Sequence, residues 1–129
     1  MTYNFPFHIS TYNDSKYQPF SAEGVLNFEG DFIELEFRIL SMMNNSKSEV
    51  QHIRMDLRQV RSVNYKSSIF GKKLQIELKS LKALEGIPFS NHDRITLFVR
   101  SSAREDAKSM ASRASLRISE IRIEELDSD

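Results

Sequence analysis

The stretch FIELEFRIL, residues 32–40, alternates apolar and charged side chains with a period of two. Its apolar members are Ile33, Leu35, Phe37 and Ile39, which alternate with Glu34, Glu36 and Arg38. Successive side chains of a β-strand point to opposite faces, so this pattern predicts a strand with one buried face and one face in water. Such a strand is typical of antiparallel sheet rather than of fully buried parallel sheet.

Segments of the same character lie on both sides of this stretch. Residues 22–28 predict a partner strand, and a tight turn that uses Gly30 joins the two. Further strands are predicted over residues 50–57, 58–66, 73–79 and 94–100, with a weaker one inside 81–93. The sequence therefore predicts a mainly β fold of about six or seven antiparallel strands.

The periodicity changes after residue 100 and indicates a C-terminal amphipathic helix. The apolar stripe consists of Ala103, Ala107, Met110, Ala111, Ala114 and Ile118. These positions lie on one face of an α-helix. The segment SARE, residues 102–105, predicts a capping box in which Ser102 and Glu105 satisfy the free amides of the first turn. The acidic residues 120–129 are expected to fray.

The N-terminal residues 1–21 hold six aromatic side chains: Tyr3, Phe5, Phe7, Tyr12, Tyr17 and Phe20. Exposure of so much aromatic surface to water is unfavourable. We therefore expect an aromatic arm that packs over the domain or against a partner. This divides the chain into an arm (1–21), a domain (22–119) and an acidic tail (120–129).

In order and spacing, residues 22–119 resemble the pleckstrin-homology-like domains, particularly the small bacterial versions. The resemblance rests on GVLNFEGDFIELEFRI, IRMDLRQVRSVNYK, FGKKLQIEL and RITLFVRSSAREDAKSMASRA, the last running directly from strand to helix. It implies two roughly orthogonal antiparallel sheets that form a partly open barrel capped by the helix. It also implies a binding or assembly module rather than an enzyme.

Two features depart from that family. Many of its members that bind inositol phosphates use basic residues around the loop between the first two strands. Here that loop is NFEGDF, residues 27–32, in which Glu29 and Asp31 would repel a phosphate. The helix tryptophan usual in the family is also missing, because the chain contains no tryptophan. The first departure argues against headgroup binding at that loop.

A basic patch is the strongest candidate for a binding site. It comprises Arg54, Arg58, Arg61, Lys66, Lys72 and Lys73, with Asp56 as the one acidic residue and Phe70 as an aromatic neighbour. Such a patch suits an anionic partner, or it is simply the solvated surface of a sheet. The segment around Gly71 has one glycine and precedes a strand, so it predicts a hairpin turn rather than a nucleotide-binding loop.

No residue pattern predicts catalysis, a metal or a cofactor. The histidines His8, His52 and His92 have no ligand spacing, and Ser90, His92 and Asp93 are too close in one loop to form a triad. Glu34 and Glu36 share one strand face and are expected to discourage aggregation rather than to act as an acid and base pair. There is no cysteine. We therefore predict a protein that is not an enzyme.

Composition sets the remaining expectations. The chain has 129 residues, a length that suits one domain, and its 18 basic and 18 acidic side chains cancel. This balance gives no support to nucleic-acid binding. No signal peptide is apparent, so a cytoplasmic location is expected. The predicted function is a non-catalytic interaction module for a protein partner or a second copy. The alternative is a peripheral binder of anionic lipid headgroups or phosphates.

Overall fold

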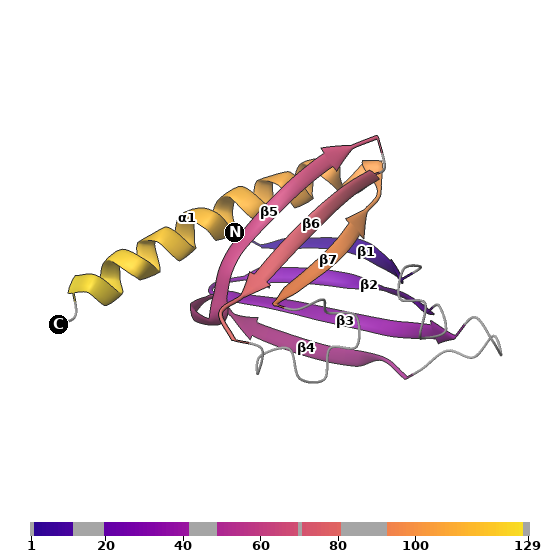
Figure 1. The fold of residues 1–129 in the computed structure, drawn as a ribbon, viewed down its shortest axis with the longest axis horizontal. Coiled ribbons are helices and arrows are strands. Elements are labelled where there is room, and N and C mark those ends of the chain that lie inside the picture. The colour runs from indigo at the N-terminus through magenta and orange to yellow at the C-terminus, as the bar shows by residue number, and fades with distance from the viewer. Residues whose placement is uncertain (1, 12–19, 42–48, 70, 81–92, 128–129) are drawn as a thin grey trace.

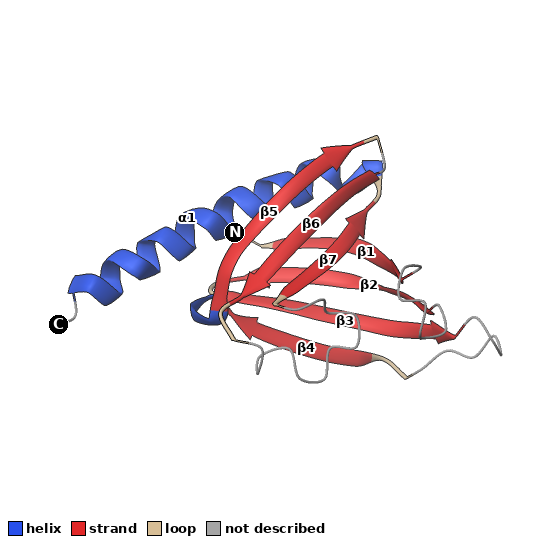
Figure 2. Ribbon diagram, in the orientation of Figure 1, coloured by secondary structure: helices blue, strands red, loops and turns tan. Residues whose placement is uncertain are grey.

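The computed structural model describes residues 2–11, 20–41, 49–69, 71–80 and 93–127, which form a mainly β fold with one C-terminal helix (Figures 1 and 2). The strands are β1 (Tyr3–Thr11), β2 (Phe20–Glu29), β3 (Phe32–Ser41), β4 (Gln51–Asp56), β5 (Val60–Ser68), β6 (Gly71–Leu78) and β7 (Arg94–Val99). The helices are η1 (Leu57–Gln59) and η3 (Ser101–Ala103), both 3-10, and α1 (Arg104–Asp127).

The seven strands of the described residues form one open antiparallel sheet in the order β4-β3-β2-β1-β7-β6-β5. Two meanders, β1–β4 and β5–β7, meet where His8 of β1 is in register with Phe98 of β7. Figure 1 shows β5–β7 running obliquely across the direction of β1–β4. The predicted antiparallel β fold with a C-terminal helix is confirmed.

The aromatic arm predicted for residues 1–21 is wrong over its first half. Residues 3–11 form β1, which lies between β2 and β7 near the middle of the sheet. Tyr3, Phe5, Phe7 and Ile9 are buried, whereas the residues between them are exposed. Burial of three aromatic rings on one face gives β1 a large hydrophobic stabilisation. Tyr12 and Tyr17 lie outside the described residues, as does the predicted weak strand within 81–92.

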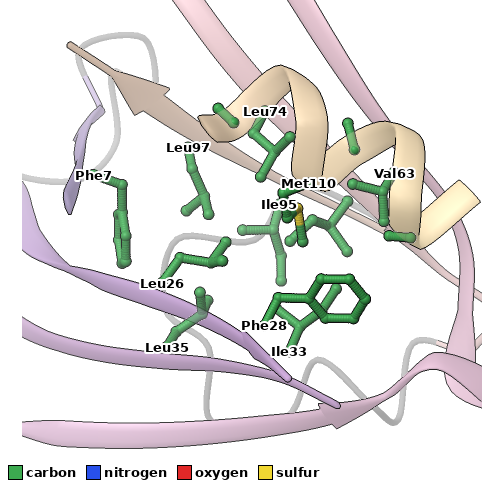
Figure 3. Close-up of a cluster of buried hydrophobic side chains, with 14 of the residues drawn as sticks. Phe7, Leu26, Phe28, Ile33, Leu35, Val63, Leu74, Ile95, Leu97 and Met110 are labelled. Atoms are coloured by element: carbon green, nitrogen blue, oxygen red, sulfur yellow. The ribbon is translucent and has the colours of Figure 1, made fainter. Parts of the chain in front are cut away.

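The core lies between the inner face of the sheet and α1, and Figure 3 shows part of it. Every alternating apolar position of β6, namely Leu74, Ile76 and Leu78, is fully buried. Met110 of α1 lies among Val63, Leu74 and Ile95 in Figure 3. The whole predicted helical stripe, from Ala103 to Ile118, is also buried. Its small alanines allow α1 to lie close to the sheet, as predicted.

Both ends of α1 differ from the sequence prediction. Ser102 lies inside η3 and α1 begins at Arg104, so the predicted capping box does not mark the start of the α-helix. Acidic Glu105 and Asp106 in the first turn complement the helix dipole instead. At the other end the helix continues through Asp127 and buries Ile121, where the acidic tail was expected to fray.

A bidentate ion pair ties α1 to the turn between β2 and β3. Arg117 Nε lies 2.7 Å from Asp31 Oδ1, and Arg117 Nη2 lies 3.0 Å from Asp31 Oδ2. The hydrogen bond from Arg117 is the main cause that lowers the pKa of Asp31 below its ordinary value. The same bond is the main cause that raises the pKa of Arg117. Asp31, which the sequence analysis considered only as a residue that would repel a phosphate, therefore holds α1 against the turn between β2 and β3.

Candidate functional site

The predicted basic patch separates into two groups in the structure. Arg54 lies on β4, Arg58 in η1 and Arg61 at the start of β5, all toward one end of the β5–β6 hairpin. Lys66 and Lys73 lie toward the other end of that hairpin. Phe70 lies outside the described residues.

The arginines of the patch form ion pairs within the chain. Arg54 lies 3.4 Å from Glu34 and its guanidinium carbon is 3.7 Å from the centre of the Phe32 ring. The other two use aspartates: Arg58 lies 3.3 Å from Asp56 and 3.6 Å from Asp31, and Arg61 lies 2.8 Å from Asp93. Local carboxylates therefore offset the positive charge that the sequence suggested for an anionic partner.

The lysines of the hairpin are arranged differently. Lys66 and Lys73 are directly opposite each other on β5 and β6, where like charges destabilise a sheet. Lys72 precedes Lys73 on the same strand, so its side chain points to the opposite face. Ile69, at the hairpin turn, is 93% exposed. The two lysines and Ile69 place charge and apolar surface together at this end of the sheet, and the sequence analysis missed Ile69.

Those residues considered for catalysis that the structure describes do not form a catalytic group. Glu34 Oε2 lies 3.2 Å from His52 Nε2, from which it can accept a hydrogen bond, and Glu36 is exposed beside it. Ser90 and His92 lie outside the described residues, and Asp93 binds Arg61. Among the residues that the structure describes, no group of three metal-binding side chains occurs. Within the same residues, no helix has the length and apolar character to cross a membrane.

A shallow hollow of about 420 Å³ lies on the outer face of β1–β3. Two arginines, Arg38 and Arg100, and two glutamates, Glu23 and Glu36, line it. Because these two basic and two acidic side chains balance, the hollow offers no net charge that would select an anion or a cation.

The outer face of α1 carries an exposed strip that the sequence analysis did not identify. We call it the α1 strip; it consists of Ser109, Ser112, Leu116, Ser119, Ile123 and Leu126. Its spacing alternates between three and four residues, which is the seam of a coiled coil. Leu116, Ile123 and Leu126 are 56%, 58% and 78% exposed. Three large apolar side chains therefore face water along one line of the helix.

A hollow of about 270 Å³ lies beside the α1 strip. Tyr3 and Phe28, whose rings stack with centres 6.3 Å apart, line it together with Gly30, Arg113, Leu116, Arg117 and Glu120. Tyr3 also shares a 2.8 Å hydrogen bond with Ser109 of the strip. We call this feature the Tyr3–Phe28 hollow. It lies between the strip and the buried Tyr3 and Phe28 of the sheet.

The same helix covers the β5 edge of the sheet. Ser115 Oγ donates a 3.0 Å hydrogen bond to the carbonyl of Val63, and Arg122 Nη2 donates a 3.0 Å bond to the carbonyl of Arg61. These two carbonyls of the edge strand are therefore already used. Pairing of a second sheet with this part of β5 is therefore disfavoured.

Comparison of the chain with models of protein families, with curated proteins and with solved structures gave no match.

Proposed function

We propose that the chain is a cytoplasmic, non-catalytic assembly module that associates with a second copy of itself through the α1 strip. The observation that supports this proposal is the exposure of Leu116, Ile123 and Leu126 at coiled-coil spacing on a helix whose other face is buried. Exposed apolar surface of this regularity marks a contact surface. The strand order and the C-terminal helix favour a pleckstrin-homology-like barrel, a fold used for binding and assembly.

Charge identifies the kind of partner. The residues that flank the α1 strip include Lys108, Arg113 and Arg122, which are basic, and Glu120 and Asp127, which are acidic. An anionic membrane would select a basic flank, and a strongly acidic or basic protein would select a flank of the opposite sign. A flank that carries both signs is self-complementary, so a second copy of the chain fits it best.

Replacement of the three large residues of the strip tests this function. In a Leu116→Ser, Ile123→Ser, Leu126→Ser triple variant the apolar contact is lost, but no buried group changes. We expect the wild type to shift from monomer to dimer as its concentration rises through the micromolar range, and the triple variant to remain a monomer. Light scattering after size exclusion measures both.

A Val25→Ser variant is the matched control, since Val25 is also an exposed apolar residue but lies on β2. It should dimerise like the wild type. A wild-type chain that stays monomeric over the whole range would refute the proposal.

A second candidate function is attachment to an anionic membrane surface by the β5–β6 hairpin. It is favoured by the exposure of Ile69 beside the directly opposed Lys66 and Lys73. An anionic lipid would relieve the repulsion between the lysines while the apolar side chain enters the interface. This surface is separate from the α1 strip, so the two functions are compatible.

Cosedimentation with vesicles that contain phosphatidylserine tests the second candidate. Replacement of Lys66 and Lys73 by glutamate should reduce the bound fraction several-fold at low salt, and moderate salt should weaken binding of the wild type. A Lys79→Glu, Lys108→Glu variant carries the same net charge but leaves the hairpin intact. If both double variants bind equally, the hairpin is not the site.

A further inference from the structure

We infer that the two copies pair with their α1 helices antiparallel, so that the C-terminal end of each α1 lies over the Tyr3–Phe28 hollow of the other copy. This inference rests on the proposed self-association and adds its geometry. Three independent features carry it: the projecting end of the helix, the size pattern of the strip, and the charges beside the strip.

The C-terminal end of α1 has a surface that its own sheet does not cover. Residues 123–127 are all exposed, and Figure 1 shows this end projecting away from the strands. The Tyr3–Phe28 hollow lies by contrast beside the earlier part of the strip, near Leu116. An antiparallel partner brings the projecting Ile123 and Leu126 of one copy to the hollow of the other. A parallel partner would pair the two projecting ends and leave both hollows open.

The side chains of the α1 strip match in size when the helices run antiparallel. One register places Leu116 opposite Ser119, Ile123 opposite Ser112, and Leu126 opposite Ser109 of the second copy. Each large residue then faces a small one, and alternation of large and small residues lets facing layers interlock. The parallel register places Leu116 on Leu116 and serine on serine, which leaves gaps at the serine layers. Ser109 adjoins Tyr3, so this register also directs Leu126 toward the hollow.

The flanking charges favour the same direction. In the antiparallel register Arg113 of one copy lies alongside Glu120 of the other, whose carboxylate also lies 3.3 Å from Arg117 of its own helix, and two-fold symmetry repeats this arrangement. The parallel register would instead bring Lys108 of one helix beside Arg113 of the second, which is repulsive, and Arg122 beside Asp127, which is attractive, so its pairs largely cancel. Opposite charges beside a helix seam set the orientation of the partner.

Cysteine cross-linking of the full chain tests the direction, because the natural sequence contains no cysteine. We expect a Ser112→Cys chain mixed with an Ile123→Cys chain to form a mixed disulfide dimer under mild oxidation, whereas neither variant alone cross-links. In parallel helices these two positions would lie about 16 Å apart along the axis, and each variant would cross-link with itself.

Exchange of the charges at positions 113 and 120 tests the direction a second time, through the affinity of the dimer and without cysteine. An Arg113→Glu variant should dimerise about tenfold more weakly, because two attractive pairs become repulsive, and adding Glu120→Arg should restore the wild-type affinity. Self-cross-linking of Ser112→Cys alone, or a dimer that cross-links in neither arrangement, would overturn the antiparallel geometry and leave self-association standing. Absence of any wild-type dimer would instead refute the proposed function.

Discussion

Replacement of Phe5 by alanine is expected to lower the free energy of unfolding by about 3–5 kcal/mol. Phe5 is 1% exposed in β1 and lies in register with the fully buried Leu26 of β2. Truncation removes the transfer free energy of the ring and leaves a cavity at the centre of the sheet. Small domains are stable by about 5–15 kcal/mol, so the variant should lose a large part of its stability. Urea unfolding followed by circular dichroism measures the loss.

Asn4→Ala is the control on the same strand. Asn4 lies on the outer face, where its amide donates a 3.2 Å hydrogen bond to exposed Asn27. Its replacement should change stability by no more than about 0.5 kcal/mol. Similar effects of both substitutions would mean that β1 contributes little to the core, and the interpretation of residues 1–21 as an arm would return.

The sequence carried a signal for β1 that two features obscured. Tyr3, Phe5, Phe7 and Ile9 do alternate, but the aromatics at positions 12, 17 and 20 break the period over the longer window. Pro6 is also unusual in a central strand, because proline cannot donate to a ladder. In the structure the pairing of β1 with β7 is confined to the register of His8 with Phe98. Pro6 therefore lies beyond that short ladder.

Local sequence patterns predicted the strands and the helix well. The binding site was predicted less well, because it depends on contacts between residues that are distant in sequence. The alternation in residues 32–40 and the alanine and methionine stripe of α1 depend on neighbours in sequence, so β3 and the buried face of α1 were predicted correctly. Whether the basic patch carries a net positive charge depends instead on which acidic side chains lie next to its arginines in space. Arg61 pairs with Asp93, 32 positions away, and no local rule reveals that partner.

The α1 strip was missed for a different reason. Its apolar spacing is visible in the sequence, but the stronger apolar stripe of the buried face of α1 obscured it. The buried stripe through Met110 and Ile118 accounts for most apolar residues of the helix and defines its inner face. Leu116, Ile123 and Leu126 keep their own spacing on the outer face, and this second stripe is the sequence signal on which the proposed self-association rests.

Replacement of Gly24 by alanine is expected to have the second large effect on stability. It should lower the free energy of unfolding by about 3 kcal/mol. Gly24 of β2 lies in register between Phe7 of β1 and Phe37 of β3. A Cβ atom at this position would lie 2.1 Å from the carbonyl oxygen of Glu36 and 2.8 Å from Cβ of Phe37. The first of these neighbours is backbone, so no change of rotamer can relieve the clash and the strands must move apart.

Gly30→Ala separates this steric effect from the general cost of replacing a glycine. Gly30 has a φ of +61°, but nothing lies within 4 Å of the position that its Cβ would take. Its replacement should cost about 1 kcal/mol through backbone strain alone. Urea unfolding of both variants should therefore place Gly24→Ala clearly below Gly30→Ala in stability. The reverse order would show that β2 and β3 separate easily at Gly24, and that the close approach of these strands does not stabilise the fold.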